Sequence, residues 1–347
     1  MKKLEDLDVA GKRVFVRADL DIPMEQLTVH SSQSTENATR LTNLKPTVDW
    51  LLGHRAKQIV IAGHIDRPEG PDPKLSTAQL EKPLEEILKR SITFRAGFDE
   101  RDHESLASLS QLILFENLRF WSGEASNDQE FAKQLASLGD VYVNEAFGNS
   151  HREHASMVAL PGFLPHAAGL HLEKEIEVLS RLLKTPERPF VAIVGGAKLE
   201  TKVPVIENLA SEADSVLVGG AIALQILNSK FEIRNENPKV KIATMTEDTK
   251  DIDKESIEKF SSVISNAKTV VWNGPMGLFE EGFDAGTKAV AQAIIDSGAY
   301  SVVGGGETTE FLASFNFLKR FSFVSSGGGA MLEFLSGKEL PGIKALE

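Results

Sequence analysis

The chain has 347 residues, enough for two domains of ordinary size, and its 41% hydrophobic and 25% charged residues are typical of a folded globular protein. The absence of cysteine excludes disulfides, thiolate catalysis and cysteine-ligated metals. A formal net charge of -12 argues against a general binder of nucleic acid or anionic membranes, and neither a membrane-spanning run nor a signal-peptide core is visible, so we expect a cytoplasmic protein.

The first half of the chain predicts strands that alternate with helices. Apolar segments that read as strands begin at Arg13, Gln58, Leu112 and Asp140, and helical patterns lie between them at 44–52 and 131–138. This alternation is typical of a doubly wound α/β fold with a parallel sheet.

Polar and charged side chains follow each of these predicted strands. Ligands of open α/β sheets bind at the carboxyl ends of the strands, so we expect these side chains to converge there. Several cations in one place indicate a site for a small, highly anionic molecule, although any one of them alone could be a solvated surface group. The residues concerned are Arg17, Asp19, Asp21, Arg40, His64, Arg67, Arg119 and Arg152.

An amphipathic helix is predicted at 173–184, with Ile176, Leu179 and Leu182 on one side, and the segment TPERP ends it. We interpret residues 171–189 as a connecting helix and hinge. This places an N-terminal lobe at 1–170 and a C-terminal lobe at 190–330, and we expect the segment 331–347 to return to the N-terminal lobe.

The second half repeats the strand pattern, but its strands run into glycine-rich turns. Glycine turns and helix N-termini present backbone amides to phosphates, and Lys198 and Lys202 fall on one face of the first helix. Any one turn could serve packing alone, and neither a P-loop nor a dinucleotide fingerprint is present. The five segments are VAIVGGAK, SVLVGGAIAL, TVVWNGPMG, YSVVGGGETTEF and FSFVSSGGGAMLEFL.

Eight motifs, in order along the chain, resemble those of the phosphoglycerate kinase family. They are RADLDIP, GHIDRP, FENLRF, VYVNEAFGNSHREHAS, GGAKLETK, WNGPMGLFE, VVGGGETT and VSSGGGAMLEFLSGKELPG. The resemblance implies a monomer of two doubly wound, Rossmann-like lobes that close about a hinge. It also implies the glycolytic reaction in which 1,3-bisphosphoglycerate and ADP give 3-phosphoglycerate and ATP, with Mg²⁺ bound together with the nucleotide.

The resemblance also implies roles for individual residues. The triose would be held by Asp19, Asp21, Arg40, His64, Arg67, Arg119 and Arg152. The nucleotide would be held by Lys198, Lys202, Gly220, Asn273, Pro275, Glu280, Gly305, Gly306, Glu307 and Thr308, with Glu307 as the metal ligand. The catalytic groups would be Arg40 and Lys198, together with the amides near Gly306 and Gly328.

The chain departs from the family pattern at several positions. Asp21 stands where the family has asparagine, Asp66 and Ala221 replace glycines, and Glu307 replaces the aspartate used on magnesium. The segment 220–273 is also shorter than in the family and lacks a motif that packs near the adenine. Recognition of the base is therefore the least certain part of the resemblance.

Two other functions stay open at this stage. One is a non-catalytic paralogue that binds phosphorylated metabolites, which the shortened segment and the added acids favour. The other is an acyl-phosphate kinase of the same mechanism with another substrate or nucleotide. We favour phosphoglycerate kinase because Arg40, Lys198 and Lys202 are retained.

Overall fold

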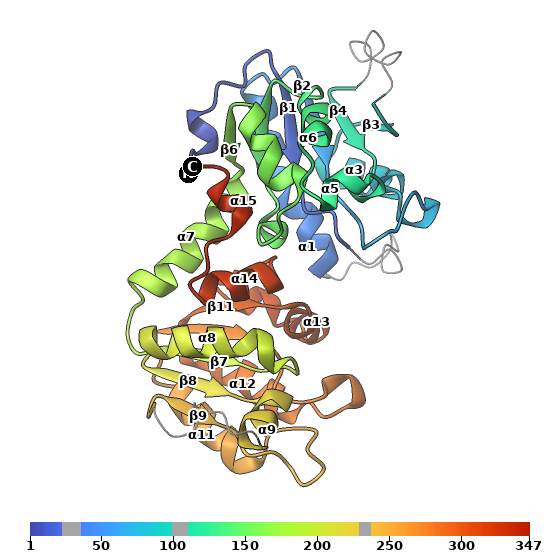
Figure 1. The fold of residues 1–347 in the computed structure, drawn as a ribbon. Coiled ribbons are helices and arrows are strands. Elements are labelled where there is room, and N and C mark those ends of the chain that lie inside the picture. Colours follow the sequence, from blue (N-terminus) through green and yellow to red (C-terminus); the bar gives the residue numbers. More distant parts are fainter. Residues whose placement is uncertain (23–35, 99–109, 229–236) are drawn as a thin grey trace. The chain divides into compact units, whose positions relative to one another are not determined.

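The computed structural model describes residues 1–22, 36–98, 110–228 and 237–347, and the chain divides into two compact units. The first unit consists of Met1–Glu175 and Glu339–Glu347, and the second of Ile176–Lys338. Each contains a six-stranded sheet in which neighbouring strands run parallel. The predicted α/β fold class is confirmed (Figure 1).

The sheet of the first unit has the strand order β3-β4-β2-β1-β5-β6. Its four central strands are those predicted from the sequence: β1 (Arg13–Arg17), β2 (Gln58–Ala62), β4 (Leu112–Phe115) and β5 (Val141–Asn144). The two edge strands, β3 (Ile92–Arg95) and β6 (His166–Ala168), were not predicted. β6 has the sequence HAA and β3 is buried at its ends only, so neither shows the apolar run of a central strand.

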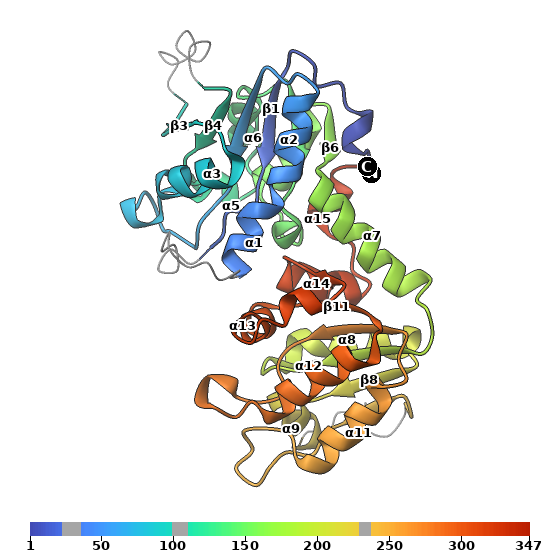
Figure 2. The same cartoon turned by 180° about the vertical axis from the view of Figure 1, so that it is seen from behind.

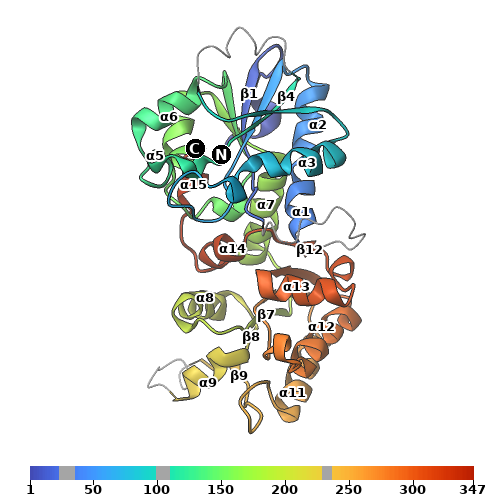
Figure 3. The same cartoon turned by 90° about the vertical axis from the view of Figure 1, so that its right-hand side faces the viewer.

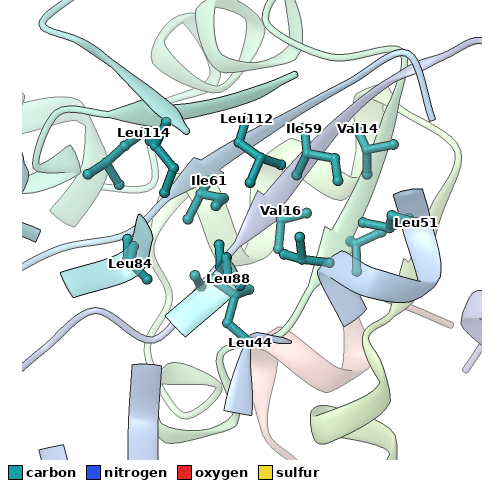
Figure 4. Close-up of a cluster of buried hydrophobic side chains, with 14 of the residues drawn as sticks. Val14, Val16, Leu44, Leu51, Ile59, Ile61, Leu84, Leu88, Leu112 and Leu114 are labelled. Atoms are coloured by element: carbon teal, nitrogen blue, oxygen red, sulfur yellow. The ribbon is translucent and has the colours of Figure 1, made fainter. Parts of the chain in front are cut away.

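Helices cover both faces of this sheet (Figure 3). On one face lie α2 (Lys45–Gly53) and α3 (Glu81–Leu88), and on the other α5 (Ser122–Ala125) and α6 (Gln129–Ala136). Leu51, Leu84 and Leu88 pack against alternate strand residues such as Val16 and Ile61, as Figure 4 shows. The opposite face is aromatic and includes the rings of Phe15, Tyr142, Phe115, Trp121 and Phe131. Helix α1 (Glu36–Asn43) precedes α2 and carries Arg40.

Both chain ends belong to the first unit and lie side by side (Figure 2). The amide of Lys2 donates to the carbonyl of Leu346 at 3.4 Å. The short helix α15 (Pro341–Lys344) is attached through the amide of Gly342, which donates to the carbonyl of Ser150 at 2.9 Å. The boundary between the units lies within α7 (Leu170–Lys184).

The sheet of the second unit has the order β12-β11-β10-β7-β8-β9. Five strands match the prediction: β7 (Phe190–Val194), β8 (Ser215–Val218), β10 (Thr269–Asn273), β11 (Tyr300–Gly304) and β12 (Phe323–Val324). The unpredicted strand is again at an edge, β9 (Val240–Ile242), and all three of its residues are only partly buried.

Helices also cover both faces of the second sheet (Figure 3). On one face lie α8 (Leu199–Glu212) and α9 (Gly220–Asn228), and α14 (Gly328–Leu335) packs on α8. On the other face lie α11 (Lys254–Ile264), α12 (Ala285–Ser297) and α13 (Gly306–Ser314), around a core that includes Trp272. No helix in the described ranges combines the length and the apolar character required to cross a bilayer.

Candidate active site

The candidate site of the first unit lies at the carboxyl ends of β4, β2, β1 and β5, which are neighbours in the first sheet. Because these strands are parallel, the loops that follow them share one edge of the sheet. Those loops carry Arg119 after β4, His64 and Arg67 after β2, Asp19 and Asp21 after β1, and Arg152 after β5. Pro23, the last residue of the RADLDIP motif, lies outside the described residues.

The charges of Arg67 and Arg152 act on the ionisation of Arg119, and the charge of Arg67 acts on that of Arg152. Burial lowers the pKa of Arg119 to about 10, and the positive charges of Arg152, Arg17 and Arg67 act in the same direction, while Asp21 opposes them. Burial and the charge of Arg67 likewise lower the pKa of Arg152. A cluster of cations of this kind is stabilised by a bound anion.

Arg40 and Asp19 adjoin this cluster. A terminal nitrogen of Arg40 donates to the carbonyl of Asp21 at 2.7 Å and lies 4.0 Å from Asp19 Oδ1. The side-chain amide of Asn149 donates to the same Oδ1 at 3.2 Å. The other carboxylate oxygen of Asp19 is buried and receives no hydrogen bond within the described part of the chain, so it can accept one from a ligand.

Beneath this site lies a buried network that we did not predict from the sequence. Arg17 is fully buried and donates from Nε to Ser156 Oγ at 2.8 Å. Glu124, also fully buried, accepts from Ser156 Oγ at 2.6 Å and from the Ser156 amide at 3.0 Å. Although burial raises the pKa of Glu124, hydrogen bonds from His154 and Ser156 and the charge of Arg17 hold it below its usual value. Glu124 is therefore the counter-charge of Arg17.

The second unit has a candidate site of its own, formed by its glycine turns. A Cβ on Gly195 would lie 2.3 Å from the carbonyl oxygen of Pro275, and one on Gly274 would lie 2.2 Å from the backbone of Gly195. Gly274 also has a φ of +97°. Only glycine permits this contact between the turns after β7 and β10.

Two helices of the second unit begin beside each other. A Cβ on Gly328, at the start of α14, would lie 3.2 Å from the Cα of Gly305, which precedes α13. Gly305 has a φ of +100°. The first backbone amides of both helices are left without intrahelical acceptors, and such neighbouring N-termini favour a phosphate.

Among the described residues of the second unit, Lys202 is the one buried lysine or arginine. It donates to Asn273 Oδ1, and burial lowers its pKa to about 8, although the charge of Glu307 opposes this shift. The side-chain nitrogen of Asn273 is buried and has no acceptor among the described residues. Lys202 and Asn273 thus present donors at the ends of α8 and β10 where these approach α13.

The remaining predicted nucleotide residues differ in exposure. Lys198, at the position before α8, is exposed, as are Glu280 in a short 3-10 helix, Gly306 and Glu307. Thr308 is buried, and its hydroxyl accepts from the Gly274 amide at 2.8 Å. The described residues contain no cluster of three or more His, Asp or Glu that could hold a metal ion. Glu307 therefore stands as a single carboxylate in the first turn of α13.

The comparisons with known proteins cover the whole chain. A family model described as phosphoglycerate kinase matches residues 4–237 and 225–338. The phosphoglycerate kinase of Desulfosudis oleivorans is 38% identical over 397 residues, with 100% of this chain and 99% of that protein covered. That of Pelotomaculum thermopropionicum is 36% identical over 395 residues, with 99% and 98% covered.

Solved structures agree with these relatives. The structure of phosphoglycerate kinase from Coxiella burnetii has a TM-score of 0.81 and 32% identity, covering 99% of this chain and 98% of that one. The enzyme from Pyrococcus horikoshii OT3 gives a TM-score of 0.84 and 30% identity, covering 100% and 98%.

The chain belongs to the phosphoglycerate kinase family. It is nevertheless a short member, because an alignment over 397 residues that includes all 347 of this chain leaves at least 50 positions without a counterpart. The two ranges matched by the family model meet at 225–237. This junction lies inside the segment 220–273, in which the sequence predicted a shortening, and residues 229–236 of that segment lie outside the described ones.

If Lys202 neutralises a phosphate of a bound nucleotide, its buried position predicts a pH dependence of nucleotide binding. A lysine must be protonated to neutralise a phosphate, and Lys202 loses its proton as the pH rises through its pKa of about 8. We expect the dissociation constant of ADP to rise about tenfold per pH unit above about 8. Calorimetric titration between pH 7 and 9.5 measures this, and Lys202→Met should bind more weakly with no such rise. An equally steep rise in Lys202→Met would assign the dependence to another group.

Proposed function

We propose that this chain catalyses the reversible transfer of a phosphoryl group between 1,3-bisphosphoglycerate and ADP, giving 3-phosphoglycerate and ATP. The proposal rests on one observation. The chain matches phosphoglycerate kinases along its whole length, and each of its two units carries a different kind of candidate anion site. Arginines converge in the first unit, and glycine turns lie beside the buried Lys202 in the second.

The first unit is proposed to bind the triose. Arg67, Arg119 and Arg152 present planar donor groups that match phosphate and carboxylate oxygens in pairs. Asp19 Oδ2 receives no hydrogen bond from the described residues, so it can accept one from the hydroxyl group of a glycerate. The chemistry of this site therefore fits a small molecule that carries a phosphate, a carboxylate and a hydroxyl group.

The second unit is proposed to bind ADP or ATP. The amides at the starts of α13 and α14, Lys202 and Asn273 would hold the phosphates. Glu307 offers one exposed carboxylate, which fits Mg²⁺, an ion usually held in such sites by one or two carboxylates together with the phosphates. When bound, Mg²⁺ would neutralise phosphate charge and orient the transferred group.

Direct transfer between two bound substrates requires positioning and charge neutralisation and no covalent enzyme intermediate. We assign neutralisation of the transferring group to Lys198 and Arg40, assisted by backbone amides near Gly306 and Gly328. Arg40 is held by its hydrogen bond to the carbonyl of Asp21. Lys198 is exposed, so its side chain can change conformation when the ligand binds. Closure about the segment 171–189, a monomeric state and a cytoplasmic location belong to the same proposal.

The direct test is a coupled assay of turnover with Mg-ATP and 3-phosphoglycerate. We expect turnover that requires both substrates and ceases when either is omitted. Calorimetric binding of both ligands without turnover would instead support a non-catalytic paralogue.

A second candidate is the same reaction with a different nucleotide, and it is favoured by the shorter chain and by the break between the two family-model matches at 225–237. The turns proposed to hold the phosphates are present on both sides of this junction. The shortening would therefore affect recognition of the base and leave the phosphate contacts in place. Comparing kcat/KM for ATP and GTP decides between the two. A preference for ATP of less than about tenfold, which is about 1.4 kcal/mol, would support the second candidate.

Glu307 yields a prediction about metal dependence. A glutamate is one methylene longer than an aspartate, which loosens the octahedral shell that Mg²⁺ demands. We expect Glu307→Asp to lower the concentration of Mg²⁺ needed for half-maximal activity, and Glu307→Gln to raise it. We also expect Mn²⁺ to support the wild type at lower concentrations than Mg²⁺.

The matched control for this prediction is Glu310→Gln, which removes a charge from the same helix, at an exposed position beyond its first turn. If Glu307→Gln needs no more Mg²⁺ than the wild type, Glu307 only stabilises the N-terminus of α13 through the helix dipole.

A further inference from the structure

Asp21 places a negative charge among the arginines of the first unit. One of its carboxylate oxygens accepts from the amide of Asp66 at 2.8 Å, and the other lies 3.5 Å from His64 Nε2. Its charge raises the pKa values of Arg119 and Arg152, against the effect of burial and of the neighbouring arginines. Asp21 therefore offsets part of the positive charge that the cluster offers to a ligand.

The protonation of His64 follows from its other neighbour. His64 Nδ1 lies 2.8 Å from a terminal nitrogen of Arg17, and a guanidinium can only donate, so Nδ1 must be the acceptor. Burial lowers the pKa of His64 to about 4, with the hydrogen bond to Asp21 opposing and the charge of Arg17 adding to the shift. At neutral pH the ring is uncharged, and its single proton is on Nε2, facing Asp21. His64 thus faces Asp21 at 3.5 Å as a neutral ring and adds no positive charge to the cluster.

Asp21 is ionised and needs no donor from a ligand. Burial raises the pKa of its carboxyl group, but the hydrogen bonds from His64 and the Asp66 amide and the charge of Arg40 hold it far below its usual range. Each of its two oxygens faces a donor of the same unit. In this respect it differs from Asp19, whose buried Oδ2 has no donor within the described residues.

We propose that Asp21 is a specificity-determining residue, a fixed counter-anion that limits how much negative charge a ligand can bring to the arginine cluster. The inference rests on the proposed function, which makes a phosphorylated hydroxy acid the ligand of this unit. Four cations, Arg40, Arg67, Arg119 and Arg152, face two carboxylates, Asp19 and Asp21. The site accordingly favours an acid with one phosphate and one hydroxyl over the same acid with a second phosphate in place of the hydroxyl.

The test compares ligands of increasing charge: inorganic phosphate, 3-phosphoglycerate and 2,3-bisphosphoglycerate. Calorimetric titrations are carried out on the wild type, Asp21→Asn and Asp21→Glu. We expect Asp21→Asn to bind 3-phosphoglycerate about tenfold more tightly, with a smaller gain for phosphate and a larger one for the bisphosphate. Asp21→Glu keeps the charge and should keep the wild-type ratio between the two acids.

Asp66→Asn is the matched control for charge alone. It removes one carboxylate from the neighbouring loop, but the Asp66 side chain is exposed, and only its backbone takes part in the hydrogen bonds to Asp21 and Arg119. Screening by solvent and salt should keep its effect on each ligand below about threefold. Thermal melts of each variant establish that it is folded, and Asp21→Ser replaces Asp21→Asn if the latter is not.

The outcomes separate this inference from the proposed function. If Asp21→Asn weakens all three ligands alike, or leaves their relative affinities unchanged, Asp21 has a structural role only and the inference is wrong. If the wild type binds phosphate but not 3-phosphoglycerate, the proposed function fails. In that case, tighter binding of phosphate by Asp21→Asn still supports the role of Asp21 as a counter-anion. An affinity for phosphate equal to that of the wild type overturns that role.

Discussion

Replacing Lys198 with alanine is expected to reduce kcat by about a hundredfold or more while leaving the affinity for 3-phosphoglycerate nearly intact. Removing one group that stabilises charge in a transition state costs about 2.7–4 kcal/mol in comparable cases. The effect should fall on turnover because Lys198 belongs to the second unit, whereas the triose is assigned to the first. The measurement is kcat from the coupled assay together with a calorimetric titration of 3-phosphoglycerate.

The exposure of Lys198 makes this substitution easy to interpret. An exposed side chain outside the core contributes little to stability, so Lys198→Ala should remain folded. Lys254→Ala removes another exposed lysine, from α11 of the same unit, and should retain the wild-type rate. A Lys198→Ala enzyme that keeps more than about a tenth of the wild-type rate would remove Lys198 from the mechanism.

All of the predicted strands except β12 are buried along most of their length. β12 is a partly buried edge strand, and it was predicted from the apolar run FSFV before a glycine-rich turn. A central parallel strand such as β10 contacts neighbours on both sides and helices on both faces, so its sequence is a continuous apolar run. β3, β6 and β9 lie at sheet edges, where fewer side chains need to be buried, and their sequences carry no comparable run. Patterns of hydrophobicity report burial, and for that reason they miss three of the four edge strands.

The residues of the candidate site were predictable only where they follow a strand. The arginines after β2, β4 and β5 were selected because each comes after a strand end, and the structure brings them together. Glu124 had no such signal. It reaches Arg17 through Ser156, which is 32 residues from Glu124 and 139 from Arg17, and pairing over such separations leaves no local pattern. The charge of His64 was likewise unpredictable, since it depends on burial and on Arg17.

The second large effect that we expect is a loss of stability when Glu124 is replaced with alanine. The substitution leaves the buried Arg17 without its counter-charge and the Ser156 amide without its acceptor. Removing one partner from a buried charged network typically costs about 3–5 kcal/mol. Because the folded-state pKa of Glu124 is lowered, its contribution is present above the pKa of an unfolded glutamate and is lost as the pH falls through the folded value.

Urea unfolding of the first unit, followed by fluorescence, measures this loss. Trp50 and Trp121 both belong to the first unit and report on it, whereas Trp272 belongs to the second. Glu130→Ala is the matched control, because Glu130 is an exposed glutamate on α6 paired only with Lys133, and it should change stability by less than about 0.5 kcal/mol. Glu124→Gln keeps the shape of the side chain but removes its charge, so its loss of stability should lie between those of Glu124→Ala and Glu130→Ala. If Glu124→Ala costs no more than Glu130→Ala, Arg17 is stabilised without Glu124, and the buried network beneath the arginine cluster does not depend on that pair.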